Sequence, residues 1–320
     1  MGSLNTPSDE VIHRSGNTGE SQMNSISSRI YKDEKDFQII LDLLVRIRPP
    51  EHLNDYPAKV NLEEDLASAA VRANTRLWFD DGQPVGWAYV DEFNNLMWEI
   101  DHRYEESLGS QVVEWGESCV RKALASEEPA TLDTNCRENY TARIAFLKRH
   151  GFQQTENTNV AMRRDLSQPI PEPKLPQGFV IRPLAGIHEA EAVAAMHRLA
   201  FGTDYMTTEN RLAIMRTSEY DLSLDMIVVA PDGAIAGNCI CSVNEQEKTG
   251  STDPVAIHPR YQGMGLARAL LARGMQLLKE RGAQSAHFGT RGDNLAMQKT
   301  GESVGFKVEH KTIWFSKEVC

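Results

Sequence analysis

The apolar and polar positions of this chain follow the same order twice. In the second half, residues 179–184 and 226–230 are apolar runs of strand length, and a Pro-Asp-Gly turn joins the latter to a third run at 234–243. From residue 265 to 281 the apolar positions are instead three and four residues apart, which predicts a helix. The other elements predicted in this half are helices at 187–201, near 207–217 and at 294–304, and strands at 253–258, 285–290 and 306–317.

The first half repeats this order. Its predicted strands lie at 75–79, 85–90, 95–101 and 130–135, and its predicted helices at 110–126 and 141–150. In each half the second helix ends at a Gly-Phe pair, Gly151-Phe152 and Gly305-Phe306, because glycine readily takes the left-handed conformation that stops a helix. We therefore predict two copies of one α/β unit.

Two polar segments mark the boundaries of these copies. Residues 1–25 are rich in Ser, Asn, Gly and Thr, and so few apolar side chains predict a disordered tail. Residues 166–178 carry four prolines and predict a stiff linker. The expected domains are therefore residues 26–165 and 179–320, which agrees with a length about twice that of one domain.

Composition excludes several classes of protein. A net charge of −11 disfavours nucleic acid as a partner and favours cationic small molecules such as amines. The five cysteines are odd in number and form no CxxC, so neither a disulfide framework nor a metal site is expected, and Cys239 and Cys241 should share one face of a strand. Without an apolar run of membrane length or a signal peptide, we expect a cytoplasmic protein with no membrane partner.

The stretch PVAIHPRYQGMGLARALL, residues 254–271, places a tight glycine loop between a predicted strand and a predicted helix. The first turn of a helix exposes N–H groups without partners and carries the positive end of the helix dipole. Two glycines in the preceding loop allow a ligand to approach the backbone closely. These features predict a phosphate-binding site.

The spacing of this loop distinguishes between kinds of phosphate site. A dinucleotide fingerprint needs a third glycine where Arg268 stands, and a Walker loop needs a Gly-Lys-Ser/Thr that is absent. The pattern Q/R-x-x-G-x-G/A is met by Gln262, Gly265 and Ala267. With Asn294 and the Gly-Phe pair downstream, residues 179 to about 316 resemble the GNAT superfamily of N-acetyltransferases. An ordinary glycine-rich turn is the plain alternative.

The resemblance implies a fold and an activity. The fold is α/β (α+β), with two tandem GNAT domains that each contain a mixed, mostly antiparallel sheet flanked by helices. The activity is direct transfer of an acetyl group from acetyl-CoA to an amine of a small molecule or peptide. A non-catalytic acyl-CoA sensor and an oxidoreductase that uses the same glycine turn for NAD remain as alternatives.

The resemblance also implies which residues bind acetyl-CoA. A backbone N–H at Ala256 or Ile257 is expected to stabilise the oxyanion. Asn294 would contact pantetheine, or would only cap its helix. The full expected set is Val255, Ala256 and Ile257 along the pantetheine arm, Gln262, Gly263, Met264, Gly265, Leu266, Ala267 and Arg268 at the diphosphate, and Asn294.

The catalytic groups depart from the family pattern. The tyrosine that the family often uses as acid is replaced by Gly301, and by Leu147 in the first half. Asp253 is our candidate for the base, with a turn residue as its alternative role. The other candidates are Glu245, Glu247 and His287 as bases, water without a dedicated base, and Tyr205, Tyr220 and Tyr261 as donors to sulfur.

The counterpart of the glycine loop in the first half is DHRYEESLGS, residues 101–110. Glu105 stands where the second half has Gln262, and Leu108 where it has Gly265. A carboxylate and a bulky side chain both disfavour a diphosphate, so we expect the first domain to bind acetyl-CoA badly or not at all. It would support the structure or shape the substrate site, in a monomer with an intramolecular pseudo-dimer or in a homodimer.

Overall fold

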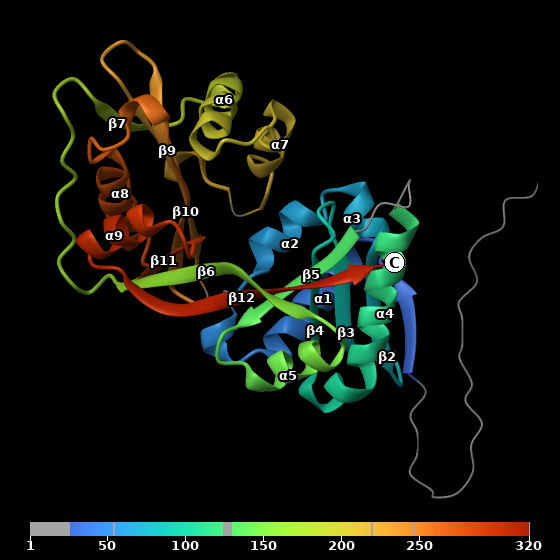
Figure 1. Ribbon diagram of the computed structural model, residues 1–320. Helices are drawn as coiled ribbons and strands as arrows, with labels where there is room; N and C mark the ends of the chain where they lie inside the picture. The colour runs from blue at the N-terminus through green and yellow to red at the C-terminus, as the bar shows by residue number, and fades with distance from the viewer. Residues whose placement is uncertain (1–25, 54, 124–129, 219, 246, 320) are drawn as a thin grey trace, which may run out of the picture. The chain divides into compact units, whose positions relative to one another are not determined.

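The computed structural model describes residues 26–53, 55–123, 130–218, 220–245 and 247–319 (Figure 1). The expected disordered tail, residues 1–25, and Cys320 lie outside this part. The chain forms two compact units. Of the described residues, unit 1 comprises those up to Asn135, Thr141–Thr155 and those from Trp314 onward, and unit 2 comprises Cys136–Tyr140 and those from Glu156 to Ile313.

Unit 1 contains an antiparallel sheet between two helical layers. Its strands follow one another in the order β1 (Ile26–Ile30), β2 (Thr75–Asp80), β3 (Gln83–Val90) and β4 (Leu96–Ile100). A further strand, β5 (Ala130–Arg137), is joined to the end of β4 by a bridge between Asn95 and Asp133. The predicted strands of the first half are all present.

Helices α1 (Glu34–Ile47) and α4 (Glu105–Ala123) cover opposite faces of the unit 1 sheet. Helix α1 (Glu34–Ile47) begins after Asp33, whose carboxylate accepts the N–H of Lys35, and its apolar stripe packs on Leu77 and Trp87. Helix α4 lies on the other face, where Trp115 meets Trp78 edge to face at 5.8 Å. The other α-helices of the described part of unit 1 are α2 (Lys59–Asp65), α3 (Ala69–Ala73) and α5 (Thr141–Arg149).

Unit 2 is built on a mixed, mostly antiparallel sheet, which confirms the predicted fold class. The strand order is β12-β6-β11-β10-β9-β8-β7. The pair β10–β11 is parallel, whereas β7–β8, β8–β9, β9–β10 and β11–β6 are antiparallel. The strands are β6 (Gln153–Asp165), β7 (Val180–Pro183), β8 (Asp225–Val229), β9 (Ile235–Asn244), β10 (Thr249–Ile257), β11 (Ser285–Arg291) and β12 (Lys307–Val319).

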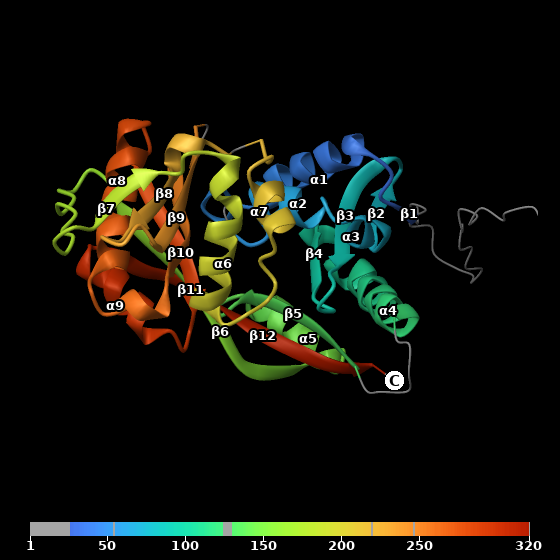
Figure 2. The ribbon, with the colours of Figure 1, turned by 90° about the horizontal axis from the view of Figure 1, so that it is seen from above.

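Helices cover both faces of the unit 2 sheet (Figure 2). Helices α8 (Leu266–Glu280) and α9 (Leu295–Ser303) are on one face, and α6 (Ala190–Phe201) and α7 (Thr208–Ile214) are on the other. Cys239 and Cys241 share the α8 face, as predicted, with their Sγ atoms 3.8 Å apart. Both Gly-Phe glycines have positive φ, 84° at Gly151 and 90° at Gly305, which confirms them as helix stops.

The structure divides the chain differently from the sequence at two strands. Residues 156–165 precede the proline-rich segment but belong to unit 2, because β6 pairs with β11 from Asn159 to Asp165. Trp314–Cys320 belongs to unit 1. The segment 166–178 contains no helix or strand, and Leu166, Ile170 and Leu175 pack against the unit 2 core.

One helix begins earlier than predicted. The apolar spacing placed its start at residue 110, but α4 begins at Glu105 and its described part ends at Ala123. Residues 124–126 of the predicted helix lie outside the described part of the chain. The early start places residues 105–109, which the sequence analysis aligned with the glycine loop of the second half, inside the helix.

Candidate active site

Strands β10 and β11 stop pairing partway along the unit 2 sheet. They pair from Thr249↔Ser285 to Ser251↔His287, and no further pair follows although β10 continues to Ile257 and β11 to Arg291. On its other side β10 shifts register against β9 between Thr252 and Val255. This bulge redirects β10 and leaves its edge toward β11 without a strand partner among the described residues.

Asp253 lies in this bulge. Its Oδ2 accepts the N–H of Gly289 at 3.2 Å, so the carboxylate joins β10 to β11 just beyond their last paired residues. Although water reaches Asp253, the surrounding protein removes part of the hydration of its carboxylate and raises its pKa to about 6, against the opposing effect of the Gly289 hydrogen bond. A carboxylate with this pKa can accept a proton near neutral pH.

The free edge of β10 offers alternate backbone groups. The N–H of His258 donates to Ala236 on β9 at 2.9 Å. Because backbone groups of successive residues point to opposite sides of a strand, those of Ala256 also face β9, whereas those of Val255 and Ile257 face the unpaired side. Of the two residues expected to supply the oxyanion N–H, the geometry therefore favours Ile257 and brings in Val255 in place of Ala256.

The glycine loop has the backbone that the sequence indicated. After a 3₁₀ turn at Pro259–Tyr261, residues 262–265 are exposed, with φ of 74° at Gly263 and 79° at Gly265. A Cβ at either glycine would meet no atom within 4 Å, so glycine is needed for the left-handed backbone and the space beside it stays open. Gln262 braces the loop with an Nε2 hydrogen bond to the Ile257 carbonyl at 3.3 Å.

The loop leads directly into α8 and presents unpaired N–H groups. Among the described residues, the backbone N–H groups from Gly263 to Arg268 donate to no other group of the chain. Leu266 is buried in the core, so only its backbone is available to a ligand, while Met264 and Arg268 are exposed. Consecutive free N–H groups at a helix start form an anion-binding site.

Asn294 caps α9. Its Oδ1 accepts the N–H of Met297 at 3.1 Å, which is the capping role considered as the alternative to ligand contact. The residue is exposed, and its side-chain amide N–H groups are a separate pair of donors.

Gly301 has a packing reason of its own. A Cβ there would lie 2.6 Å from Phe288 Cζ and 3.3 Å from Met162 Sδ. Helix α9 therefore approaches β11 too closely for a tyrosine at this position without repacking. The departure from the family pattern is thus built into the contact between α9 and the sheet.

The other candidate bases are less suited to proton transfer. Glu245 and Glu247 lie in the turn after β9. His287 is half-buried on β11, and burial lowers its pKa. Of these three, His287 pairs with Ser251 at the last position before the bulge, where its carbonyl accepts the hydroxyl of Thr252 at 3.5 Å.

The three tyrosines differ in their surroundings. The hydroxyl of Tyr220 donates to Asp225 at 2.6 Å, and burial raises the pKa of Tyr220. The hydroxyl of Tyr261 donates to Asp232 at 3.3 Å. Tyr205 is exposed. Both hydroxyl groups therefore donate to carboxylates that lie outside the bulge.

Sequence reasoning missed Gly289. The N–H of Gly289 donates to the Asp253 carboxylate and holds it in place. Both residues are exposed to water. A glycine inside a predicted strand is a known sign of close backbone approach, so the stretch SAHFGT did carry the signal.

The equivalent place in unit 1 is filled by charged side chains. Arg143 Nε donates to Glu105 at 2.6 Å, and the guanidinium lies 3.6 Å from the ring centre of Trp98. Arg143 also lies 3.8 Å from Glu99, and Leu108 is fully buried. No residue from 102 to 108 has a positive φ, so this region has no counterpart of the glycine loop.

Other kinds of site were sought in the same part of the chain. No group of three or more His, Cys, Asp or Glu side chains that could hold a metal ion occurs among the described residues. Within those residues, no helix combines the length and the apolar character needed to cross a membrane.

Comparison with known proteins agrees with this geometry. The model of the acetyltransferase (GNAT) family matches residues 190–306, which contain β10, the glycine loop, α8 and α9. A mycothiol acetyltransferase of Nocardia farcinica is 29% identical over 164 residues, covering 48% of this chain and 54% of that protein. The chain spans about half the length of the first curated relatives that it matches.

Solved structures resemble the chain over most of its length. A GCN5-related N-acetyltransferase from Sphaerobacter thermophilus superposes with a TM-score of 0.72 and 21% identity, covering 92% of this chain and 96% of that one. A tandem GNAT protein from the clavulanic acid biosynthesis pathway gives a TM-score of 0.69 at 15% identity, covering 92% and 98%. At these identities the likeness shows the fold.

Proposed function

We propose that unit 2, which contains the residues 190–306 matched by the acetyltransferase (GNAT) family model, transfers an acetyl group from acetyl-CoA to an amine of a small molecule or peptide. The observation that carries the proposal is the combination of a free strand edge, a carboxylate in its bulge and a run of unpaired N–H groups at the start of α8. Each of these matches one part of such a reaction.

Acetyl-CoA fits the described backbone. Its diphosphate would accept hydrogen bonds from the N–H groups between Gly263 and Arg268, with the Arg268 guanidinium beside them. Its pantetheine arm carries amides that can pair with Val255 and Ile257 as an added strand would. Asn294 would offer its amide N–H groups from the second helix while its oxygen caps α9.

The reaction needs a neutral amine and a place for negative charge. Asp253 accepts the proton that the amine must lose, the amine nitrogen then bonds to the acetyl carbon, and the bond from that carbon to sulfur breaks. The N–H of Ile257 or Val255 stabilises the charge on the carbonyl oxygen. As the bond to sulfur breaks, a water takes the second amine proton and gives a proton to the departing thiolate, since Gly301 takes the place of the tyrosine that the family often uses.

A non-catalytic acyl-CoA sensor is the second candidate. The missing tyrosine favours it, and the raised pKa of Asp253 and the position of this carboxylate beside the free edge favour an enzyme. Turnover with any amine decides between the two.

The test compares two glycines on α8. Gly265 precedes the helix and Gly282 follows it; both have positive φ and open space at the Cβ position. Substitution by glutamate therefore imposes a similar backbone strain at each, but only Gly265→Glu places a carboxylate in the loop. Calorimetric titration of acetyl-CoA should show one site, weakened at least a hundredfold in Gly265→Glu and retained in Gly282→Glu.

Other outcomes would change the conclusion. Binding that survives in Gly265→Glu would place the cofactor elsewhere, and no binding to the parent chain would leave only a shared fold. An amine screen by release of free CoA then tests catalysis.

A further inference from the structure

Gly289 on β11 lies beside the carboxylate of the proposed base, and its missing side chain leaves an open position there. A Cβ built on Gly289 would lie 3.5 Å from Asp253 Oδ2, and no other atom of the described residues beyond its chain neighbours would come within 4 Å. The φ of Gly289 is not positive, so the backbone does not require a glycine here. The open space beside the carboxylate is therefore the distinctive property of this residue.

This open position is on the face of the unit 2 sheet where α6 and α7 lie. Phe288 points to the other face, since a Cβ on Gly301 of α9 would be 2.6 Å from its ring. Successive residues of a strand point to opposite faces, so Gly289 and the Asp253 carboxylate beside it are on the α6 side. An acceptor at Asp253 and a diphosphate at the start of α8 would therefore approach from different faces.

The carbonyl of Gly289 is the second group at this position. The N–H of Gly292 donates to the Thr158 carbonyl of β6 at 2.7 Å, so even-numbered residues of β11 direct their backbone groups toward β6. Gly289 directs its N–H and its C=O toward β10 instead, in agreement with its bond to Asp253. Since β11 pairs with β10 only over Ser285–His287, the Gly289 carbonyl accepts no hydrogen bond in the described part of the chain.

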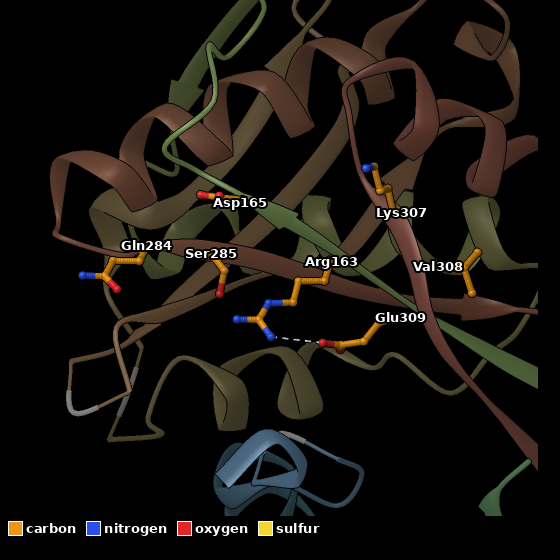
Figure 3. A pocket seen from close by; sticks show the side chains of 7 residues that line it. All are labelled: Arg163, Asp165, Gln284, Ser285, Lys307, Val308 and Glu309. Carbon is orange, nitrogen blue, oxygen red and sulfur yellow. Dashed lines mark hydrogen bonds and ion pairs between the residues drawn. The ribbon is translucent and has the colours of Figure 1, made fainter. Parts of the chain in front are cut away.

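No cation pairs with the Asp253 carboxylate among the described residues, and no charged side chain contributes to its pKa. Arg163 lies opposite His287 on β6, and Figure 3 shows its guanidinium directed to Glu309, 3.2 Å away. The cavity of about 490 Å³ around this pair is lined by two cations and two carboxylates, so its own charge is balanced. His287 is neutral because burial lowers its pKa. An ammonium ion would bring the positive charge that is missing beside Asp253.

We propose that the acceptor places its nitrogen over Gly289, at what we call the amine position, and that this glycine determines which amines fit. The ammonium group would donate one N–H to the Asp253 carboxylate and another to the Gly289 carbonyl. This inference rests on the proposed acetyl transfer, since it names a residue that binds the substrate of that reaction.

The three N–H groups of a primary ammonium ion match this arrangement. In the proposed reaction Asp253 takes one proton, a water takes another, and the third stays in the amide product, where the Gly289 carbonyl accepts it. A secondary ammonium ion has only two N–H groups, and acetylation removes both. The Gly289 carbonyl would then lose its hydrogen bond, and a second carbon would have to fit beside Asp253.

The experiment uses the full chain and three pairs of amines. These are n-butylamine, benzylamine and glycinamide, each beside its N-methyl derivative. Each probe is tested as an acceptor, by release of free CoA from acetyl-CoA, and as a ligand, by calorimetry in the presence of CoA, which requires no turnover. Acetyl-CoA binding, urea unfolding and the pH profile are measured for every variant.

Two variants each add one heavy atom to the same face. Gly289→Ala fills the amine position and leaves an ordinary contact with Asp253. Ala161→Ser is the matched control, because Ala161 lies opposite Gly289 on β6, one strand further from the carboxylate.

In the parent chain each primary amine should exceed its N-methyl derivative about tenfold or more in kcat/KM. Gly289→Ala should lower kcat/KM for the primary amines about tenfold or more and weaken their binding by a similar factor. Its acetyl-CoA affinity, its free energy of unfolding and its rise of activity near pH 6 should stay as in the parent, since the carboxylate keeps its place. Ala161→Ser should change amine kinetics less than about threefold.

The two proposals fail in different ways. Absence of acetyl-CoA binding, or binding without turnover of any amine, overturns the proposed function and this inference with it. Equal kinetics for primary and N-methyl amines, or amine kinetics that Gly289→Ala leaves unchanged, overturns the amine position while acetyl transfer stands.

Two further results would also count against the amine position. If Gly289→Ala shifted the pH profile or lost acetyl-CoA, Gly289 would act only by holding Asp253 or the fold. If other amines were acetylated but none of the six probes bound or reacted, the nitrogen would be recognised elsewhere.

Discussion

The two halves of the chain form the same turn, and their backbones differ from the residue after that turn onward. In unit 2, His258 Nδ1 accepts the N–H of Arg260 at 3.1 Å; in unit 1, the Asp101 carboxylate accepts the N–H of Arg103 at 3.1 Å. Each turn ends in a tyrosine whose hydroxyl donates to an aspartate of the hairpin before it. These pairs are Tyr261 with Asp232 and Tyr104 with Asp80.

Beyond the tyrosine the backbones differ. Unit 2 inserts the exposed residues 262–265 before α8, whereas in unit 1 the helix α4 begins at once with Glu105 and Glu106 in its first turn. Carboxylates at a helix start interact with the positive end of the helix dipole, which would otherwise be available to a phosphate. The turn that precedes the loop is therefore common to both halves, and the two left-handed glycines are present in unit 2 alone among the described residues of these two turns.

The largest expected effect concerns Asp253, whose counterpart in unit 1 is the buried Leu96. Asp253→Asn should lower kcat/KM about 10² to 10⁴-fold, because the amide cannot accept a proton. In the parent chain activity should rise with pH through about 6, since the carboxylate is the active form and its pKa is raised to about 6. Steady-state rates from pH 5 to 9 measure this limb.

The Asp253→Asn variant should lose this rise of activity with pH, whereas the control variant Asp42→Asn on α1 should keep it. A pH profile that Asp253→Asn leaves unchanged would show that water acts without a dedicated base. The difference between the halves would then lie in the loop alone.

A smaller effect is expected from the ion pairs that fill unit 1. Arg143 and Arg149 both lie on α5, and each pairs with a glutamate of α4, at 2.6 Å and 3.0 Å. Arg143 is buried and Arg149 exposed. Arg143→Leu should lower the free energy of unfolding by about 3 kcal/mol, because it removes a buried cation that pairs with Glu105 and Glu99, and Arg149→Leu by less than about 1 kcal/mol.

Urea unfolding measures both changes. Acetyl-CoA stoichiometry in the Arg143→Leu variant should stay at one, since a loop of left-handed glycines is still missing. A second acetyl-CoA site in this variant would mean that the charged cluster alone had blocked unit 1.

The smallest effect separates two roles of Asn294. Asn294→Ala should cost about 1 kcal/mol of stability because the cap is lost, while Asn294→Asp should keep the cap through its carboxylate. If the side-chain amide also contacts pantetheine, acetyl-CoA should bind about tenfold more weakly to both variants. Equal binding by parent and variants, measured by calorimetry, would leave Asn294 as a cap alone.

Much of this architecture could be predicted from local patterns. The elements of the second half follow from apolar spacing and turn residues, because each is a continuous stretch with one period. The glycine loop was predictable for the same reason, since its glycines and the start of the helical apolar spacing lie within ten residues of one another. Asp253 could be named as a candidate from the sequence, but the sequence did not show that the N–H of Gly289 holds its carboxylate in place.

The remainder depended on contacts between distant segments. The start of α4 was placed five residues late because Leu108 is the only apolar residue in its first turn and Glu105 is satisfied by Arg143, far along the chain. Strand β6 is largely polar, and its place beside β11 cannot be read from its own residues. The cavity likewise combines β6, β11 and β12, and no single stretch of sequence contains it.

Strand β6 also bears on where this chain could be divided. It is encoded before the proline-rich segment, yet it pairs with β11 in the unit that carries the glycine loop. A gene trimmed to begin at residue 179 would encode a sheet with the β11 edge bare, and bare edges recruit strands from other molecules. Deletion or recombination at the apparent domain junction would thus remove a strand of the sheet that carries the glycine loop.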